Sequence, residues 1–389
     1  MRILLVIHSI DPDDGGTVEG FKQWSNIFRA AGHEVDVASM DSPEFVSKCA
    51  FPAKAFGLGP GKGIYGYTSR AIPWLKENHS RYDLVIVVSI WQYCTLAVYR
   101  ALAGTGTPYA VYVQGMLDPY FKKRYPLKHL KKLIYWRTTL RKILRDANAV
   151  FFTCEEEKLL ARQSFSNYRA HEVIVPSGTS GPECDTTSAG EEFLARFPHL
   201  RGKRVALCLG RIHPKKAIDV LIKSFAQTLA TNKEWHLVIA GPDQIGWQKE
   251  LEAMAENLGV ADRISWTGML KGESKWGAFA TSEIFVLPSH QENFGIVVAE
   301  ALACGLPAII SDKVNIWPEI ESYKAGFVGD DTVEGTAASL GRWSALSAEE
   351  IAGTRSRSIK CFNEQFNMDV TGDRLLAIVE RMARSNPAS

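Results

Sequence analysis

Residues 284–310, IFVLPSHQENFGIVVAEALACGLPAII, contain two short apolar runs with a polar loop and a helical segment between them. The apolar runs, at 284–287 and 307–310, are typical of parallel strands that are covered on both faces. We expect the helix to begin near residues 294–296 and to end at the break around Gly305. The stretch therefore predicts a strand–helix–strand unit, the building block of a parallel α/β sheet.

The same alternation continues along the chain, with amphipathic stretches such as 17–31 and 94–103 between apolar runs. It predicts an α/β protein with two doubly wound parallel sheets. From about Ala348 onward the pattern is helical only. The other expected strands are 2–8, 34–39, 83–88, 109–114, 149–153 and 172–175, then 204–209, 235–240, 263–266 and 326–328.

A segment rich in Ser, Gly, Pro and Thr at 176–190 interrupts this alternation and is interpreted as a linker. We therefore expect two Rossmann-like domains, at 1–180 and 181–365. The final segment, 366–389, is expected to be a helix that crosses back to the first domain. Because ligands of such sheets bind at the carboxyl ends of the strands, we expect one site in a cleft between two facing domains.

The composition of the 389-residue chain, 46% hydrophobic and 23% charged, excludes disorder as its main state. The 45 Lys and Arg nearly balance the 43 Asp and Glu, so no nucleic-acid partner is expected. No apolar run reaches the roughly 18–20 residues of a membrane helix. The seven cysteines are scattered without a CxxC motif, which favours a reducing compartment. We therefore expect a cytoplasmic protein.

Two acidic residues, Glu292 and Glu300, stand eight positions apart in the opening stretch. Eight helical steps span about 12 Å, too far for both carboxylates to act on one bond, so we interpret them as gripping opposite ends of one elongated ligand. Between them, the backbone N–H groups of Asn293, Phe294 and Gly295 suit an anion at a helix N-terminus. The structural alternative is a capping Glu292 and a solvated Glu300, although the apolar neighbours of Glu300 indicate burial.

The turn at 209–219, LGRIHPKKAID, places Arg211, Lys215 and Lys216 directly after an expected strand. Cations at the carboxyl end of a parallel strand can neutralise a diphosphate leaving group. The alternative is a solvated basic turn. In the first loop, the Gly15–Gly16 pair would let a phosphate approach the backbone, but its spacing does not match the GxGxxG dinucleotide fingerprint, and a bare pair is also typical of a simple turn.

Together these segments resemble the family 4 glycosyltransferases, which have the GT-B fold. ENFGIVVAE resembles the family's E-x7-E signature, and GRIHPKKAID resembles its donor-diphosphate turn. GGT in the first loop and AGPD at 240–243 also fit. The resemblance covers nearly the whole chain and is strongest in 204–330. It implies a retaining reaction without an obligate metal or other cofactor, and the absence of a clear DxD-type carboxylate cluster agrees.

The resemblance also assigns roles to individual residues. Glu292 matches the glutamate that holds hydroxyls of the donor sugar, and Glu300 matches the one that hydrogen-bonds the ribose. Arg211 and Lys216 match the pair that binds the diphosphate, and with Glu292 they are the expected catalytic residues. The other expected donor-binding residues are Gly15, Gly16, Gly241, Met269, Leu270, Asn293, Phe294 and Gly295.

One departure from the family lies in YVQGMLDP, residues 112–119. Family members often carry a histidine after the fourth strand of the N-terminal domain, and Gln114 takes its place here. Glutamine can hydrogen-bond a sugar hydroxyl but is neither an acid nor a base near neutral pH. We expect Gln114 and Asp118 on the acceptor side or in contact with the sugar.

Residues 122–145, KKRYPLKHLKKLIYWRTTLRKILR, include ten Lys or Arg and no acid. Leucines and isoleucines recur among them at helical spacing, so we expect one apolar and one cationic side of a helix. Three interpretations stay open: a docked helix with a solvated basic face, a surface for an anionic membrane or a lipid-diphosphate acceptor, and a nucleic-acid patch, which nothing else on the chain supports.

We therefore expect a hexosyltransferase that moves a sugar from a nucleotide-diphosphate-sugar to a hydroxyl of a glycan, carried on a lipid. The setting would be bacterial-type cell-surface polysaccharide synthesis at the cytoplasmic face of the inner membrane. One alternative is a nucleotide-sugar epimerase or hydrolase on the same fold, against which Gln114 counts. The other is a non-catalytic scaffold of a polysaccharide assembly complex, against which the intact Glu292, Glu300, Arg211 and Lys216 count.

Overall fold

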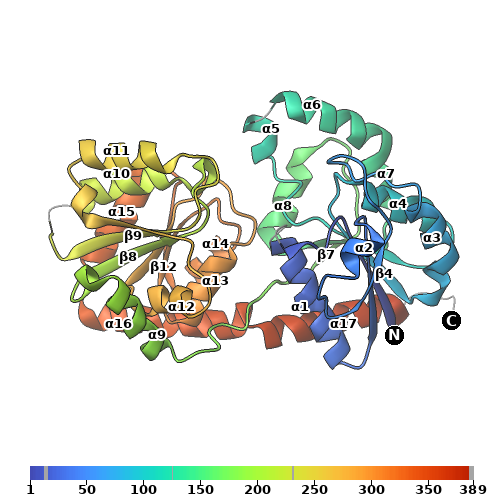
Figure 1. Ribbon diagram of the computed structural model, residues 1–389. Coiled ribbons are helices and arrows are strands. Elements are labelled where there is room, and N and C mark those ends of the chain that lie inside the picture. Colours follow the sequence, from blue (N-terminus) through green and yellow to red (C-terminus); the bar gives the residue numbers. More distant parts are fainter. Residues whose placement is uncertain (13–15, 125, 230–231, 385–389) are drawn as a thin grey trace. The chain divides into compact units, whose positions relative to one another are not determined.

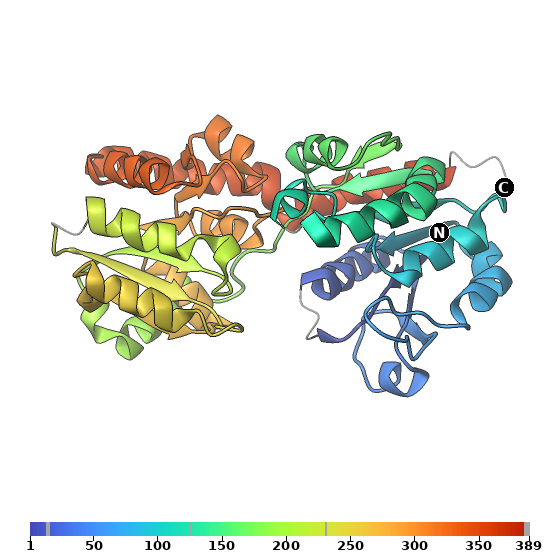
Figure 2. The same cartoon turned by 90° about the horizontal axis from the view of Figure 1, so that it is seen from above.

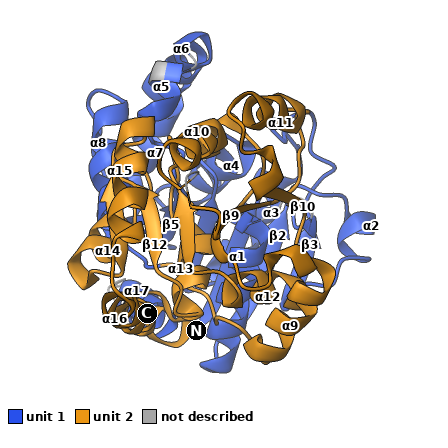
Figure 3. Ribbon diagram, turned by 90° about the vertical axis from the view of Figure 1, so that its left-hand side faces the viewer, with its two compact units in different colours: residues 1–176, 372–389 blue, residues 177–371 orange. Residues whose placement is uncertain are grey.

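The computed structural model describes residues 1–12, 16–124, 126–229 and 232–384. These residues form two compact units, Met1–Pro176 with Gly372–Ser389 and Ser177–Thr371 (Figures 1 and 3). Each unit is built on one parallel sheet with helices on both of its faces, which confirms the predicted α/β class of two doubly wound sheets.

The sheet of unit 1 has seven strands in the order β3-β2-β1-β4-β5-β6-β7. Its order reverses between β1 and β4, so the two neighbouring strands are followed by crossovers in opposite directions. The strands are β1 (Arg2–Ile7), β2 (Glu34–Ser39), β3 (Lys54–Gly57), β4 (Leu84–Val88), β5 (Tyr109–Tyr112), β6 (Ala149–Phe152) and β7 (Glu172–Ile174).

The sheet of unit 2 has six strands in the order β10-β9-β8-β11-β12-β13, with the reversal between β8 and β11. Ligands of open α/β sheets bind outside the carboxyl ends of the strands at such a reversal. The strands are β8 (Arg204–Leu209), β9 (Trp235–Ala240), β10 (Ile264–Gly268), β11 (Ile284–Leu287), β12 (Ala308–Ser311) and β13 (Gly326–Gly329).

Unit 1 has an apolar core on each face of its sheet. Along β4, Leu84 and Ile86 belong to one core and Val85 and Val87 to the other, as the two-residue period of a strand requires. Helices α1 (Gly16–Ala30) and α17 (Met368–Arg384) pack on the first core (Figure 2). The other helices are α2 (Pro43–Val46), α3 (Ala71–Asn78), α4 (Tyr93–Leu102), α5 (Tyr120–Arg124), α6 (Pro126–Tyr135), α7 (Arg141–Asp146) and α8 (Glu155–Ser164).

Unit 2 has one continuous apolar cluster that includes all six strands. Its α-helices are α9 (Thr186–Arg196), α10 (Ile218–Thr228), α11 (Gln248–Asn257), α12 (Glu273–Ala280), α13 (Ile296–Ala303), α14 (Trp317–Tyr323), α15 (Val333–Ser344) and α16 (Ala348–Cys361). The predicted helical character of the last stretch is confirmed, with a π-helical turn at Phe362–Phe366 between α16 and α17.

Two expectations about local structure were wrong. The expected linker at 176–190 ends in a helix, because Asp185 caps α9 by accepting from the Thr187 and Ser188 amides at 3.0 and 3.4 Å. Strand β3 was not expected, because Lys54–Gly57 is short and lies at the sheet edge, where half-exposed positions carry little apolar pattern.

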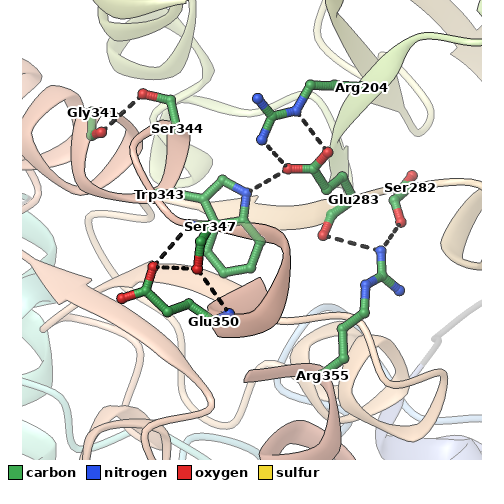
Figure 4. Close-up of polar contacts among 9 residues, drawn as sticks. All are labelled: Arg204, Ser282, Glu283, Gly341, Trp343, Ser344, Ser347, Glu350 and Arg355. Carbon is green, nitrogen blue, oxygen red and sulfur yellow. Dashed lines mark hydrogen bonds and ion pairs between the residues drawn. The ribbon is translucent and has the colours of Figure 1, made fainter. Parts of the chain in front are cut away.

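A polar network fastens helices α15 and α16 to the amino-terminal ends of β8 and β11 (Figure 4). Glu283, directly before β11, receives two hydrogen bonds from the Arg204 guanidinium at 2.7 and 2.8 Å. The Trp343 indole N–H donates to the same carboxylate at 2.9 Å, and Arg355 donates to the Ser282 carbonyl at 2.9 Å. Because Trp343 is fully buried, this carboxylate satisfies a donor that has no access to water.

No helix within the described ranges is long and apolar enough to span a membrane. All seven cysteines are free thiols, and burial raises the pKa of Cys94, Cys208, Cys304 and Cys361 to about 12. These buried thiols therefore stay protonated near neutral pH and serve as apolar packing groups.

Candidate active site

The candidate site of unit 2 lies at the carboxyl ends of β8 and β11, on either side of the reversal in strand order. The loop after β8 carries Arg211 and Lys216, and the loop after β11 carries Glu292. The Lys216 Nζ forms an ion pair with the Glu292 carboxylate. The structure thus brings together two of the three residues that the sequence predicted as catalytic.

A short 3₁₀ turn, Pro214–Lys216, positions the lysine. His213 caps this turn by accepting from the Lys215 amide at 3.1 Å, and Ala217 adopts the left-handed conformation before α10 begins. Burial, followed by the charges of Lys215, Arg211 and Lys216, lowers the pKa of His213. The imidazole is therefore neutral at pH 7, and the turn's positive charge rests on its lysines and arginine.

Backbone hydrogen bonds hold the Glu292 loop from two sides. The Lys215 carbonyl accepts from the His290 amide at 2.8 Å, which joins this loop to the lysine turn. The Glu292 amide donates to the Lys313 carbonyl at 2.9 Å, which joins it to the loop after β12. Since the side chains of Lys216 and Glu292 are only 17% and 21% exposed, water screens their attraction less than at an open surface.

Gly295 makes the sharp entry into α13 possible. Its φ is +74°, a conformation that side chains disfavour, and a Cβ there would lie 3.2 Å from both the Glu292 Cγ and a methyl of Val314. Phe294 is 9% exposed, and its ring packs edge-on against Phe366 with centroids 5.7 Å apart. The Phe294 side chain therefore anchors the loop, and the backbone of this residue is the part that can bind a ligand.

Arg211 differs from Lys216 in being exposed, with one hydrogen bond to Gln244 at 3.4 Å. Gly241, on the loop after β9, is tightly packed against the loop that carries Arg211. A Cβ at Gly241 would lie 1.8 Å from the Gly210 carbonyl oxygen, so this predicted donor-binding residue is first of all a packing requirement between two loops.

Glu300 lies on α13 and is 9% exposed, so the alternative of a solvated helical acid was wrong. Its carboxylate forms a 2.7 Å ion pair with Lys275 on α12, and the lysine stacks over Trp276 at 4.3 Å from the ring centroid. Lys275 was not predicted as a site residue, because no sequence motif marks it. The distance expected between Glu292 and Glu300 assumed that both lie on one helix. That assumption was wrong, because α13 begins at Ile296 and Glu292 lies in the loop before it.

Two of the predicted donor-binding residues, Met269 and Leu270, follow β10. Met269 is 51% exposed, whereas Leu270 is 8% exposed and belongs to the core of unit 2. The Leu270 side chain therefore holds the loop in place, and Met269 presents the accessible apolar surface next to Gly268.

In unit 1, Gly15 lies outside the described residues, and Gly16 begins α1. A Cβ at Gly16 would meet nothing within 4 Å among the described atoms. Gln114 lies beyond the end of β5 and has a φ of +49°, which is rare for a residue with a side chain. Its Oε1 accepts from the Thr17 hydroxyl at 3.0 Å, so α1 and the turn after β5 meet here.

Two acids shape the turn that contains Gln114. Glu157, buried on α8, accepts hydrogen bonds from the Gly115 amide and from the Thr153 amide and hydroxyl. Asp118 accepts from the Tyr120 amide at 2.7 Å and so starts α5. Glu157 was not predicted as a site residue, because a run of three glutamates at the start of a helix is typical of a solvated surface.

No three His, Cys, Asp or Glu side chains gather as a metal site within the part of the chain that the structure describes. Arg211, Lys216 and Lys275 are among the positively charged side chains that this site of unit 2 offers to an anionic ligand.

Two family models match this chain. The glycosyl transferase 4-like domain matches residues 15–178, and the glycosyl transferases group 1 model matches residues 191–350. The chain belongs to glycosyltransferase family 4. The second match contains the Lys216–Glu292 pair and Glu300, so the site described above lies in the segment shared with the family.

Curated relatives of this family 4 glycosyltransferase include the D-inositol 3-phosphate glycosyltransferase of Gordonia bronchialis, 26% identical over 255 residues, or 63% of this chain and 55% of that protein. Another is the GDP-mannose-dependent alpha-(1-6)-phosphatidylinositol monomannoside mannosyltransferase of Mycolicibacterium smegmatis, 28% identical over 206 residues, or 50% of this chain and 52% of that protein. The chain thus spans about half the length of these relatives.

Solved structures confirm the predicted GT-B fold. Sucrose-phosphate synthase from Thermosynechococcus elongatus has a TM-score of 0.77 at 17% identity and covers 99% of both chains. Anabaena HepE in complex with UDP and glucose has a TM-score of 0.74 at 17% identity, covering 98% of this chain and 100% of that one. At these identities the likeness concerns the fold.

The two acids differ in their partners, which predicts different consequences of their loss. Glu300→Ala should weaken binding of a free nucleoside diphosphate by about ten- to a hundredfold, the loss of a charged hydrogen bond. Glu292→Ala should not weaken that binding, because it removes a carboxylate that competes for Lys216, but it should reduce turnover. Calorimetry with UDP and GDP on the folded variants measures both affinities. Equal losses in the two variants would contradict this division.

Proposed function

We propose that the protein transfers a sugar from a nucleotide-diphosphate-sugar donor to a hydroxyl of a glycan acceptor. The observation that carries this proposal is the Lys216–Glu292 pair at the strand reversal of unit 2, with Arg211 on the same loop as Lys216. A cation and a carboxylate in contact match the two ends of a sugar phosphate, because the cation attracts the phosphate and the carboxylate accepts from sugar hydroxyls. By their names, one relative depends on GDP-mannose and one similar structure holds UDP, which supports this donor class.

In the proposed reaction, the acceptor oxygen bonds to the anomeric carbon while the bond from that carbon to the diphosphate breaks. The departing phosphate oxygen takes the acceptor's proton, so the charges balance without an acidic or basic side chain. Arg211, Lys216 and the backbone before α13 stabilise the negative charge that develops on the leaving group. The new bond would form on the face that the diphosphate leaves, which retains the anomeric configuration.

We also propose that the Gln114 side-chain amide hydrogen-bonds a sugar hydroxyl. Its hydrogen bond with Thr17 and the buried Glu157 under the turn fix its backbone in a conformation that is costly elsewhere. Positioning of this kind contributes to catalysis without proton transfer.

Incubation with UDP- and GDP-sugars and glycan acceptors tests the proposal directly. A new glycoside supports it. An isomerised donor would favour an epimerase, release of free sugar alone would favour a hydrolase, and binding without consumption would favour a scaffold.

We predict that Arg211→Ala and Lys216→Ala each lower kcat/KM at least about a hundredfold, the typical loss when one donor to a developing charge is removed. Lys223→Ala, which removes a partly exposed lysine of α10 that pairs with Asp219, is the matched control and should leave the rate unchanged. EDTA should have little effect, since protein cations replace a metal in this proposal. Activity lost in EDTA and restored by magnesium or manganese would contradict the metal-free reaction.

We further propose that helix α6 binds an anionic membrane that carries a lipid-linked acceptor. Leu127, Leu130 and Ile134 are 83%, 57% and 61% exposed and lie on one helix face at steps of three and four. Lys128 and Lys131 are exposed on the same helix. Exposed aliphatic residues beside lysines are typical of helices that lie in a membrane interface.

The second half of the basic segment does not take part in this surface. The helix is interrupted by a π-helical turn at Trp136–Leu140, and Leu140, Ile143 and Leu144 are buried in the core of unit 1. The expectation of one continuous apolar side was therefore wrong. Lys132 also turns inward, stacks 4.5 Å from the Trp91 centroid and has a pKa lowered by burial.

We predict that the protein co-sediments with vesicles containing anionic phospholipid, not with neutral ones, and is released by high salt, because salt screens surface attraction. Lys128→Glu with Lys131→Glu should abolish the association while donor binding persists. Lys48→Glu with Lys76→Glu, on other exposed positions of unit 1, is the matched control. Wild-type protein that ignores anionic vesicles at low salt would leave α6 as a solvated face and favour a soluble acceptor.

A further inference from the structure

A second basic site lies at the opposite edge of the unit 2 sheet from Arg211 and Glu292. A cavity of about 460 Å³ opens between the segments that precede β8, β9 and β10. Because the six-residue strand β8 spans about 20 Å, the cavity is well separated from the carboxyl-end loops. Its lining groups that can carry positive charge are His199, Lys203, Lys233, His236 and Arg263.

One carboxylate, Asp262, opposes these groups in the described lining. Its side chain is 82% exposed, and its oxygen is 4.0 Å from the Arg263 Nε. Water screens so open a carboxylate, so it offsets little of the positive charge. The cavity therefore favours a negatively charged occupant.

A shared serine joins the two histidines. The Ser265 Oγ lies 2.7 Å from the His199 Nε2 and 2.9 Å from the His236 Nε2. A hydroxyl has one proton, so it can donate to only one of the imidazoles and must accept from the other. This arrangement fixes both rings toward the same point of the cavity wall.

His236 is 5% exposed, and burial, followed by the charges of His199 and Lys203, lowers its pKa to about 4. Lys233, Arg263 and Asp262 are the other charged groups of the cavity lining. The ring is thus neutral at pH 7, chiefly because burial disfavours its charged form. An anion in the cavity would raise this pKa toward its ordinary value.

We propose that this cavity binds a small molecule through a phosphate or diphosphate group, independently of the donor site. Lysine ammonium groups, an arginine fork and imidazoles are the side chains that bind phosphate oxygens. The volume exceeds what one phosphate needs, which leaves room for the organic part of a phosphorylated metabolite. The proposal does not depend on the chemistry at Lys216 and Glu292.

Histidine ring NMR with inorganic pyrophosphate tests the proposal, because each site has its own reporters. His199 and His236 report on the cavity, and His213 and His290 lie in the loops of the donor site. Pyrophosphate should shift the His199 and His236 signals saturably and raise the apparent pKa of His236. No saturable shift at millimolar pyrophosphate would overturn the proposal.

Lys203→Gln with Lys233→Gln should weaken this binding at least about tenfold while the responses of His213 and His290 persist. Lys249→Gln with Lys360→Gln removes the same charge from exposed positions elsewhere in unit 2 and should have no effect. Asp262→Asn should tighten binding. Equal weakening by both double variants would mean that net charge alone attracts the probe and would overturn a built site.

Discussion

The ion pair between Lys216 and Glu292 is the interaction around which unit 2 is arranged. It joins the two loops that follow the strands on either side of the sheet reversal, and the Lys215–His290 and Glu292–Lys313 backbone bonds extend the connection to a third loop. Each partner prevents the other from being a lone, half-buried charge, which would be costly. A phosphate ligand could take over the role of the carboxylate toward the lysine without moving the backbone.

The strands behind this pair are fixed at their other end by a second charged group. Glu283 lies directly before β11. Its carboxylate links Arg204, at the start of β8, with Trp343 on α15. Strands β8 and β11 are thus fastened by polar contacts at both edges and by apolar packing between them. A scaffold held in this way keeps the loops of the site in register. Catalysis by positioning depends on that register, because small displacements of the reacting groups lower the rate.

Much of the fold was readable from the sequence because continuous apolar runs mark buried parallel strands. Strands such as Glu34–Ser39, Trp235–Ala240 and Ile284–Leu287 have the predicted bounds. The edge strand at Lys54–Gly57 was not readable, since it lacks that run. Motif spacing pointed to Glu292, Glu300, Arg211 and Lys216, whereas Lys275 and Glu157 act through contacts 25 and 42 positions away in the chain, which a single sequence does not reveal. The basic segment shows the same limit, because its helical pattern cannot tell core leucines from exposed ones.

A crystal structure with UDP or GDP bound tests the central claim most directly. The account predicts diphosphate oxygens within hydrogen-bonding distance of the Arg211 guanidinium and the Lys216 Nζ, with ribose hydroxyls at the Glu300 carboxylate. The contradicting result would be a nucleotide whose phosphates bind away from the carboxyl ends of β8 and β11. In that structure the Lys216–Glu292 pair would be intact and would not contact the nucleotide.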